Sequence, residues 1–131
     1  MAIVRHITLN MLNNSKKTFK NVGLKALRKK AGRWNKLSFC EQMANIGSEV
    51  ERALIWRAKN GSVYSRNAFE RALELVDLTL GTVSNFARLK EIARMREAMV
   101  DYFMGNNEFS STDVSWRKYF SHFTYAVRKN Y

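Results

Sequence analysis

Apolar residues recur at three- and four-residue steps along most of the chain after residue 37, which is the spacing of one face of an α-helix. The pattern predicts four helices, over residues 38–60, 65–81, 85–104 and 111–129. Short polar segments separate them, and no stretch shows a convincing strand-like alternation. Because short connections favour antiparallel neighbours, we expect an all-α fold, an up-down-up-down four-helix bundle.

Residues with strong end preferences stand at the predicted helix boundaries. Ser38 and Glu41 have the spacing of a capping box at the start of the first helix. Gly61 suits the left-handed position that follows this helix. Gly81 and Gly105 are expected to close the second and third helices. These signals place the helix ends in the polar segments.

One apolar stripe on each predicted helix is expected to form the core. The stripes consist of Met43, Ile46, Val50, Ala53 and Leu54; of Phe69, Ala72, Leu73, Val76 and Leu80; of Phe86, Leu89, Ile92, Ala93, Met99, Val100 and Phe103; and of Trp116, Tyr119, Phe120, Phe123 and Val127. Exposed aromatic rings could instead stack on nucleic-acid bases. At helical spacing a core role is favoured for Trp56, Phe69, Phe86, Phe103, Trp116, Phe120 and Phe123.

Charge divides the chain into two unequal parts. The 131 residues carry a net charge of +12. Residues 1–36 hold ten basic residues and no acidic one, whereas residues 37–131 hold 13 basic and 11 acidic residues, which gives +10 and +2. We therefore predict a basic, partly helical N-terminal extension over residues 1–36 and a nearly neutral bundle over residues 37–131.

A segment of +10 is expected to attract a polyanion, most often nucleic acid, through contacts to phosphate. The alternatives are that these residues only solubilise the chain, and that the basic residues of the bundle belong to a surface of ion pairs. The candidate nucleic-acid-binding residues are Lys16, Lys17, Lys20, Lys25, Arg28, Lys29, Lys30, Arg33 and Lys36 in the extension, and Arg88, Lys90, Arg94, Arg117, Lys118, Arg128 and Lys129 in the bundle.

Composition and motifs exclude several other classes. The single cysteine, Cys40, cannot form an intramolecular disulfide or a multi-cysteine zinc site, and it is interpreted as a structural thiol. No phosphate-binding loop, dinucleotide fingerprint or zinc-protease motif occurs, so we expect no cofactor and no metal. No apolar stretch is long enough for a spanning helix, and the first residues lack the features of a signal peptide. A cytoplasmic protein without membrane contact is expected.

One pair of residues could be catalytic. Arg117 and His122 form an Arg-x4-His pattern on the last predicted helix. This pattern resembles the signature of the HEPN ribonucleases, helical proteins in which arginine and histidine from paired subunits cleave RNA. The chemistry would use His122 as an acid or base toward a 2′-hydroxyl and Arg117 on the scissile phosphate. The alternative is an arginine and a histidine that merely share a surface.

The bundle also resembles a known family. The segments that carry the resemblance are Leu37–Leu54, Ala68–Leu75, Asp101–Thr112, Trp116–Phe120 and Ala126–Arg128. Through them residues 35–131 are similar to small bacterial four-helix-bundle proteins, namely the accessory variability determinant (Avd) of diversity-generating retroelements and the proteins of 23S rRNA intervening sequences. The resemblance implies a homo-oligomer, commonly a pentamer, that binds nucleic acid and a reverse transcriptase and is not an enzyme.

The extension resembles a different family. Residues 2–12 (Ala-Ile-Val-Arg-His-Ile-Thr-Leu-Asn-Met-Leu), followed by residues 22–32 (Val-Gly-Leu-Lys-Ala-Leu-Arg-Lys-Lys-Ala-Gly) and Trp34, are similar to the C-terminal tail of H-repeat-type insertion-sequence transposases. Arg33 is inserted here between the glycine and the tryptophan. The catalytic acids of those enzymes lie upstream of this tail, so none is implied here. The two resemblances meet beside the charge step, which suggests a transposase tail joined to a complete small bundle.

Three functions follow from these observations. The leading hypothesis is a non-enzymatic, oligomeric nucleic-acid-binding bundle that acts as a reverse-transcriptase accessory protein. The first alternative is a HEPN-like ribonuclease that uses Arg117 and His122. The second is a purely structural, self-assembling bundle fused to a vestigial transposase tail.

Overall fold

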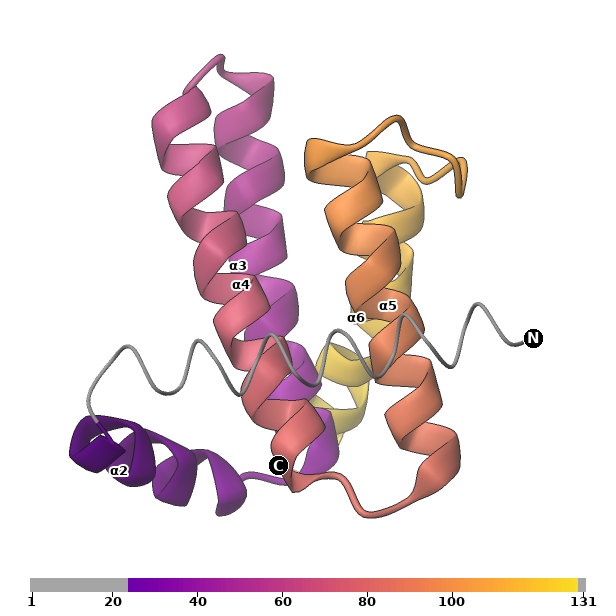
Figure 1. Cartoon of the computed structure of the whole chain (residues 1–131). Coiled ribbons are helices and arrows are strands. Elements are labelled where there is room, and N and C mark those ends of the chain that lie inside the picture. The colour runs from indigo at the N-terminus through magenta and orange to yellow at the C-terminus, as the bar shows by residue number, and fades with distance from the viewer. Residues whose placement is uncertain (1–23, 130–131) are drawn as a thin grey trace.

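The computed structural model describes the backbone of residues 24–129 and the side chains of residues 29–129. This part of the chain is helical throughout apart from its connections, and it contains no strand, which confirms the all-α prediction. The helices, shown in Figure 1, are α2 (Leu24–Asn35), α3 (Phe39–Ala58), α4 (Ser62–Thr82), α5 (Phe86–Met104) and α6 (Asp113–Lys129).

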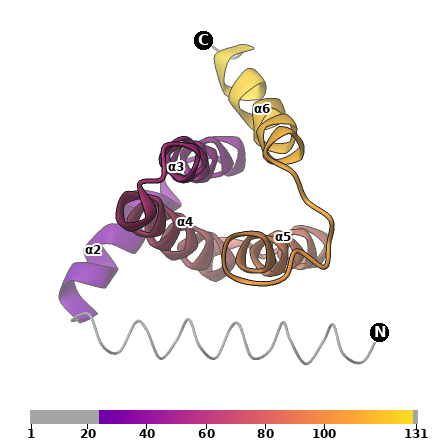
Figure 2. The ribbon, with the colours of Figure 1, turned by 90° about the horizontal axis from the view of Figure 1, so that it is seen from above.

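The helices pack around a central hairpin made of α3 and α4. Helix α6 packs on α3, whereas α5 and α2 pack on α4. The view in Figure 2 shows the order α5, α4, α3, α6, with α5 and α6 standing apart at its two ends. The connections α3–α4 and α5–α6 lie at the top of Figure 1, and the α4–α5 connection lies at the bottom. The result is a bundle-like helical fold.

The start of α3 forms as the sequence predicts. Ser38 is the N-cap, and its hydroxyl accepts a hydrogen bond of 3.1 Å from the backbone N–H of Glu41. The carboxylate of Glu41 accepts in return from the N–H of Ser38, also at 3.1 Å. Two backbone donors that helix formation leaves without partners are thereby satisfied. The capping box is confirmed.

Two glycine predictions are wrong. The left-handed residue after α3 is Asn60 (φ 60°), whereas Gly61 has a φ of −84° and is already the N-cap of α4. Asn60 can adopt this conformation because its short polar side chain tolerates it. A glycine is needed next to it because a Cβ on Gly61 would lie 2.8 Å from Cε3 of Trp56. Helix α4 also continues through Gly81 to Thr82.

The predicted apolar stripes do form the core. Its largest fully buried side chains are Phe69, Met43, Ile46, Leu54, Ile92, Met99, Val50, Val76 and Thr79. Trp116 and Phe120 of α6 are buried against them. Two aromatic residues assigned to the core are exposed instead, Phe86 at 70% and Trp56 at 38%. Phe86 is the first residue of α5 and Trp56 lies in the last turn of α3, so neighbouring helices do not cover them.

Helix α2 is joined to the core by Trp34. The Trp34 side chain is 92% buried, since its exposed fraction is 8%, and its Nε1–H donates to the Thr79 hydroxyl at 2.9 Å. The Gln42 side-chain amide donates to the Trp34 carbonyl at 2.9 Å. Lys30 forms an ion pair with Glu74. Trp34 therefore packs in the bundle, although it lies on the extension side of the predicted boundary after residue 36.

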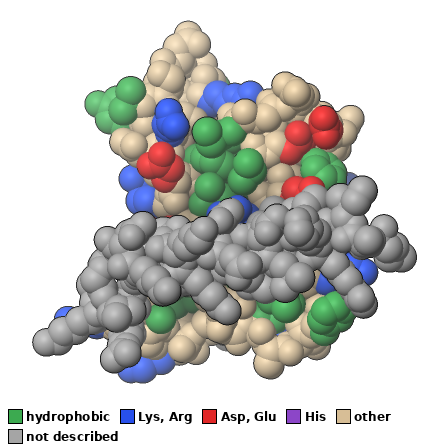
Figure 3. Space-filling model, viewed as in Figure 1, with side chains coloured by type: hydrophobic (Ala, Val, Ile, Leu, Met, Phe, Trp, Pro, Cys, Tyr) green, Lys and Arg blue, Asp and Glu red, His purple; other side chains and the backbone are tan. Residues whose placement is uncertain are grey.

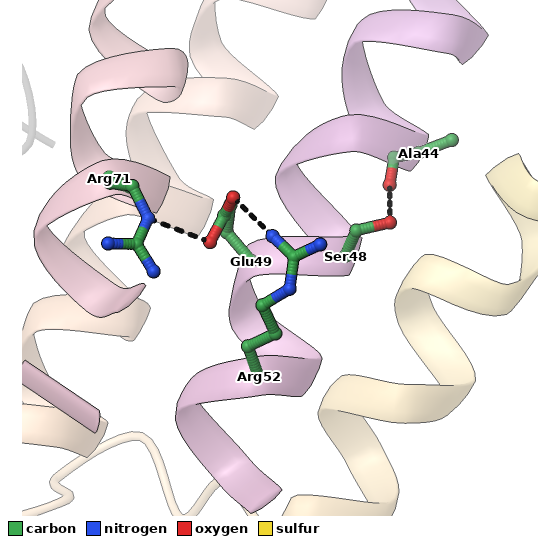
Figure 4. Close-up of polar contacts among 5 residues, drawn as sticks. All are labelled: Ala44, Ser48, Glu49, Arg52 and Arg71. Carbon is green, nitrogen blue, oxygen red and sulfur yellow. Dashed lines mark hydrogen bonds and ion pairs between the residues drawn. The ribbon is translucent and has the colours of Figure 1, made fainter. Parts of the chain in front are cut away.

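Polar contacts fix α3 to α4 on the outer side of the hairpin. Glu49 of α3 accepts hydrogen bonds from Arg71 of α4 at 3.2 Å and from Arg52 of its own helix at 2.7 Å (Figure 4). The Glu49 side chain is 14% exposed, so both contacts are partly protected from water. The Ser48 hydroxyl donates to the Ala44 carbonyl at 3.2 Å and stays within α3. Glu49 is thus shared by two cations.

Side chains rather than close backbone packing join α5 to α6. The Tyr119 hydroxyl of α6 donates to Glu91 of α5 at 3.0 Å, and the Tyr102 hydroxyl of α5 donates to Asp113 of α6. Burial, together with the nearby carboxylate of Glu91, raises the pKa of Tyr119 above its usual value. Burial and the contact with Asp113 also raise the pKa of Tyr102. Both tyrosines therefore stay neutral while they bridge the two helices.

Candidate nucleic-acid interface

The candidate residues of the extension are only partly covered by the structure. Lys16, Lys17 and Lys20 lie outside the described residues, as do the side chains of Lys25 and Arg28. Of the others, three are exposed on or just after α2, and one pairs with an acid. The exposed residues are Lys29, Arg33 and Lys36, and the paired residue is Lys30, which contacts Glu74. The helix that holds them is anchored through Trp34, so these charges have a fixed place beside α4.

The candidate residues of α5 stand among acidic and aromatic groups. The Arg88 guanidinium lies over the Phe39 ring, 4.5 Å from its centroid. Lys90 and Arg94 line a cavity of about 720 Å³ between α5 and α6, whose lining also contains Glu91 and Glu97. The carboxylates reduce the attraction of this cavity for an anion.

The candidate residues of α6 are exposed, and one of them is neutralised. The Arg117 Nε–H lies 3.1 and 3.0 Å from the two carboxylate oxygens of Glu51 on α3. This contact raises the pKa of Arg117. Lys118 and Lys129 are exposed, and Arg128 lines a cavity of about 480 Å³ between α3 and α6. Arg117 is therefore a weaker phosphate ligand than its neighbours on the helix.

The candidate residues whose side chains the structure describes do not lie in one patch. Helix α2 lies beside α4, whereas α6 lies on the far side of α3 (Figure 2). On the face shown in Figure 3, basic side chains stand at separate places among hydrophobic and acidic ones. A polyanion could therefore meet α2 and α6 together only by passing around the hairpin.

The ribonuclease pair is not assembled within this chain. Arg117 and His122 are five residues apart on α6, which rotates their side chains by about 140° around the helix axis. Arg117 lines the cavity between α3 and α6, where it pairs with Glu51. His122 is exposed and is absent from that lining. In the described residues, the cavity that Arg117 lines therefore does not include His122.

Other chemistry finds little support in the described residues. No group of three or more histidine, cysteine, aspartate or glutamate side chains could hold a metal ion there. Cys40 is a free, partly buried thiol. The buried Nε1–H of Trp116 has no hydrogen-bond partner in the described part of the chain, and Trp116 lines the cavities on both sides of α6.

Sequence reasoning missed one basic and aromatic surface, at the α3–α4 connection. Trp56 is exposed there beside Tyr64, together with Arg57 and Lys59. The signal that could have found it is the run Trp-Arg-Ala-Lys-Asn-Gly at residues 56–61, which joins an aromatic residue and two cations to a turn without an acid.

Comparisons with protein-family models, with curated proteins and with solved structures return no match for this chain. None of the helices in the described residues is long and apolar enough to cross a membrane.

Proposed function

We propose that this chain is a non-enzymatic nucleic-acid-binding protein, in which a helical bundle holds a basic N-terminal extension against the backbone of RNA or DNA. The observation that carries the proposal is the charge step, with ten basic residues and no acidic one in residues 1–36. Contact with phosphates would release counterions, which gives such a segment affinity without sequence preference.

The described part of the extension supports this proposal. Lys29, Arg33 and Lys36 are exposed, and no carboxylate among the described residues lies within ion-pair distance of them. Trp34, which lies between Lys29 and Lys36 in the sequence, packs in the core. This turn of the chain is therefore already ordered before nucleic acid binds. A preformed helix loses less conformational entropy on binding than a flexible tail would.

The resemblance to Avd-type bundles suggests a more specific role. We propose that helices α3–α6 form an up-down-up-down bundle that self-associates and acts as an accessory protein to a reverse transcriptase. The cavity between α5 and α6 supports self-association because Phe109, one of its lining residues, is 55% exposed and leaves apolar surface open. Light scattering on the full chain tests this role; a monomer at all concentrations would contradict it.

Substitution of the exposed α2 cations tests nucleic-acid binding. A triple variant with Lys29→Gln, Arg33→Gln and Lys36→Gln should bind labelled RNA more weakly than the parent chain. The slope of log affinity against log salt concentration should become shallower by about 2, at roughly 0.7–0.9 for each phosphate that the variant no longer binds. Fluorescence anisotropy at several salt concentrations measures both quantities.

The matched control keeps the charges and changes only the side chains. The triple variant Lys29→Arg, Arg33→Lys and Lys36→Arg should retain the parent slope. If the glutamine and charge-conserving variants bind alike, with the parent slope, the exposed α2 cations do not contact phosphate.

A further inference from the structure

The connection between α3 and α4 brings together aromatic and basic side chains that the proposed function has not used. We define the hairpin tip as residues Trp56–Arg66. Its eleven residues include three basic ones and no acidic one. It lies at the top of the molecule in Figure 1, at the end opposite the α4–α5 connection. Its positive charge and its distance from that connection make it a separate surface.

Two aromatic rings contact each other in a tilted arrangement and are open to solvent at the hairpin tip. The centroids of Trp56 and Tyr64 lie 4.6 Å apart, and the ring planes differ by 31°. This separation is at the short end of the range for favourable aromatic pairs. Trp56 is 38% exposed and Tyr64 is 59% exposed. The pair therefore presents aromatic surface that the fold does not cover.

The turn itself fixes the inner ring of this pair. The Gly61 N–H donates to the Trp56 carbonyl at 2.8 Å, and a Cβ on Gly61 would lie 2.8 Å from Cε3 of Trp56. The indole thus lies directly against the Gly61 backbone. Because Trp56 is held in place before any ligand arrives, a third ring could stack on the pair with little loss of side-chain freedom.

One cation lies over the aromatic pair, and two more belong to the hairpin tip. Nζ of Lys59 lies 5.7 Å from the centroid of the Trp56 ring. Among the described residues, no carboxylate lies within ion-pair distance of Lys59 or Arg57. Arg66 lies 3.5 Å from Glu70, but both side chains are more than 60% exposed, so this pair contributes little. The hairpin tip therefore carries positive charge that the fold leaves mostly uncompensated.

A cavity of about 410 Å³ lies at the same connection and adds a second feature that suits an anion, although neither Trp56 nor Tyr64 lines it. Its charged lining residues are Arg57 and Arg66, its floor includes Phe69 and Phe103, and no carboxylate belongs to the lining. The Arg57 guanidinium lies over the Tyr102 ring, 4.9 Å from its centroid, and its Nη1 donates to the Tyr102 carbonyl at 3.4 Å. The cavity is within the size range of small-molecule sites.

We propose that the hairpin tip binds single-stranded nucleic acid, with an unpaired base stacked on the Trp56–Tyr64 pair and neighbouring phosphates contacted by Arg57, Lys59 and Arg66. Aromatic platforms beside a positive groove are the common means of holding single strands. A duplex buries the faces of its bases, so only an unpaired base can reach the platform. The inference rests on the proposed function and assigns it a single-stranded ligand.

Removing the outer ring tests the platform in the full chain. Tyr64→Ala should weaken binding of a labelled single-stranded RNA at least about fivefold, since stacking of one base contributes that much or more. Binding of a duplex of the same length should stay unchanged. Tyr64→Phe keeps the ring and should restore the parent affinity for the single strand.

A control variant removes another exposed ring, elsewhere in the molecule. Phe86 is 70% exposed at the start of α5, at the opposite end of the molecule from the hairpin tip (Figure 1). Phe86→Ala should bind single-stranded RNA like the parent chain. If Phe86→Ala and Tyr64→Ala weaken binding equally, the loss does not come from the platform, and the inference is overturned.

Fluorescence provides a signature that a purely structural role for the ring would not produce. Trp56 is 38% exposed, whereas Trp34 and Trp116 are 8% and 6% exposed. Stacking of a base on the pair should quench the tryptophan emission of the parent chain. In Trp56→Phe the same RNA should bind while the quench disappears. Quenching that persists in Trp56→Phe would contradict a base at this site.

The outcomes separate this inference from the proposed function. If the parent chain binds RNA in a salt-dependent way while Tyr64→Ala binds single strands equally well, the hairpin tip is not the site and the proposed function stands. If the parent chain binds no nucleic acid at low salt, both fail. If Tyr64→Ala instead dissociates an oligomer of the free chain in light scattering, the hairpin tip is a contact between copies, and the inference is overturned.

Discussion

At the scale of single residues, the sequence predicted burial well where a side chain lies in the middle of a helix. Met43, Ile46 and Met99 are fully buried, as their spacing indicated. The failures, Trp56 and Phe86, lie at helix ends. Periodicity describes which face of a helix a residue occupies, but it does not describe how far the neighbouring helix extends along it.

Tyr119 supplies a prediction about alkaline pH. Its folded-state pKa is raised, whereas a tyrosine in the unfolded chain ionises near pH ~10. The unfolded state therefore loses this proton first, and stability should fall as the pH rises above about 10. In Tyr119→Phe this contribution is absent, so the melting temperature should fall less steeply between about pH 9 and pH 11.

Thermal melts of both proteins across this range measure the effect. The offset between the two curves at neutral pH reports the missing hydrogen bond to Glu91, at about 1 kcal/mol. Only the difference in slope reports the titration. Parallel curves up to pH ~11 would show that Tyr119 does not hold its proton more firmly in the folded chain.

At the scale of the helices, most elements and several ends could be predicted, but their contacts could not. The capping box at Ser38 is a local pattern, so it was visible in the sequence. The true start of α4 was missed because the turn is so short that Gly61 caps the next helix. The separation of α5 from α6 depends on which large side chains lie between them, such as Trp116 and Tyr119, and no periodicity encodes it.

The candidate interface shows the same limit. The number and position of the basic residues were evident, but their pairing was not. Glu51 on α3 neutralises Arg117 on α6, and Glu74 on α4 pairs with Lys30 on α2. These residues are far apart along the chain, so only the packed helices bring them together.

Substitutions at two glycines test how closely α3 approaches α6. Gly47 of α3 is buried, and a Cβ there would lie 2.8 Å from Cβ of Phe120 on α6. Gly47→Ala should therefore force α3 and α6 apart and destabilise the chain by about 1–3 kcal/mol. Chemical denaturation monitored by circular dichroism measures the change.

The matched control is a helical glycine without a neighbour. A Cβ on Gly81 of α4 would meet nothing within 4 Å. Gly81→Ala should stabilise the chain by about 0.5–1 kcal/mol, because alanine has the higher helix propensity. If the two variants change stability in the same direction, the close contact at Gly47 does not constrain the helix pair.

At the scale of the whole molecule, the charge step and the packing boundary do not coincide. The last basic residue before the first acid is Lys36, but Trp34 is already part of the core. Helix α2, the described part of this basic segment, is held on the bundle through Trp34 and Lys30. This coupling joins the two regions that the sequence resemblances separate.

Truncation tests that coupling. A chain that begins at Arg33 keeps Trp34 and its hydrogen bond to Thr79, so it should still unfold in one cooperative helical transition. A chain that begins at Leu37 lacks this tryptophan and should be less stable by about 3–5 kcal/mol. Thermal melts followed by circular dichroism compare the two. A non-cooperative melt of the longer chain would show that the extension is needed for folding.

The central claim is that the full chain binds nucleic acid through phosphate contacts. Its most direct test is the affinity of the full chain for a labelled single-stranded RNA over a series of salt concentrations. We predict binding at low salt that weakens linearly on a log–log scale, with a slope of about −0.7 for each phosphate contacted. No binding at low salt, or an affinity that salt does not change, would contradict the claim.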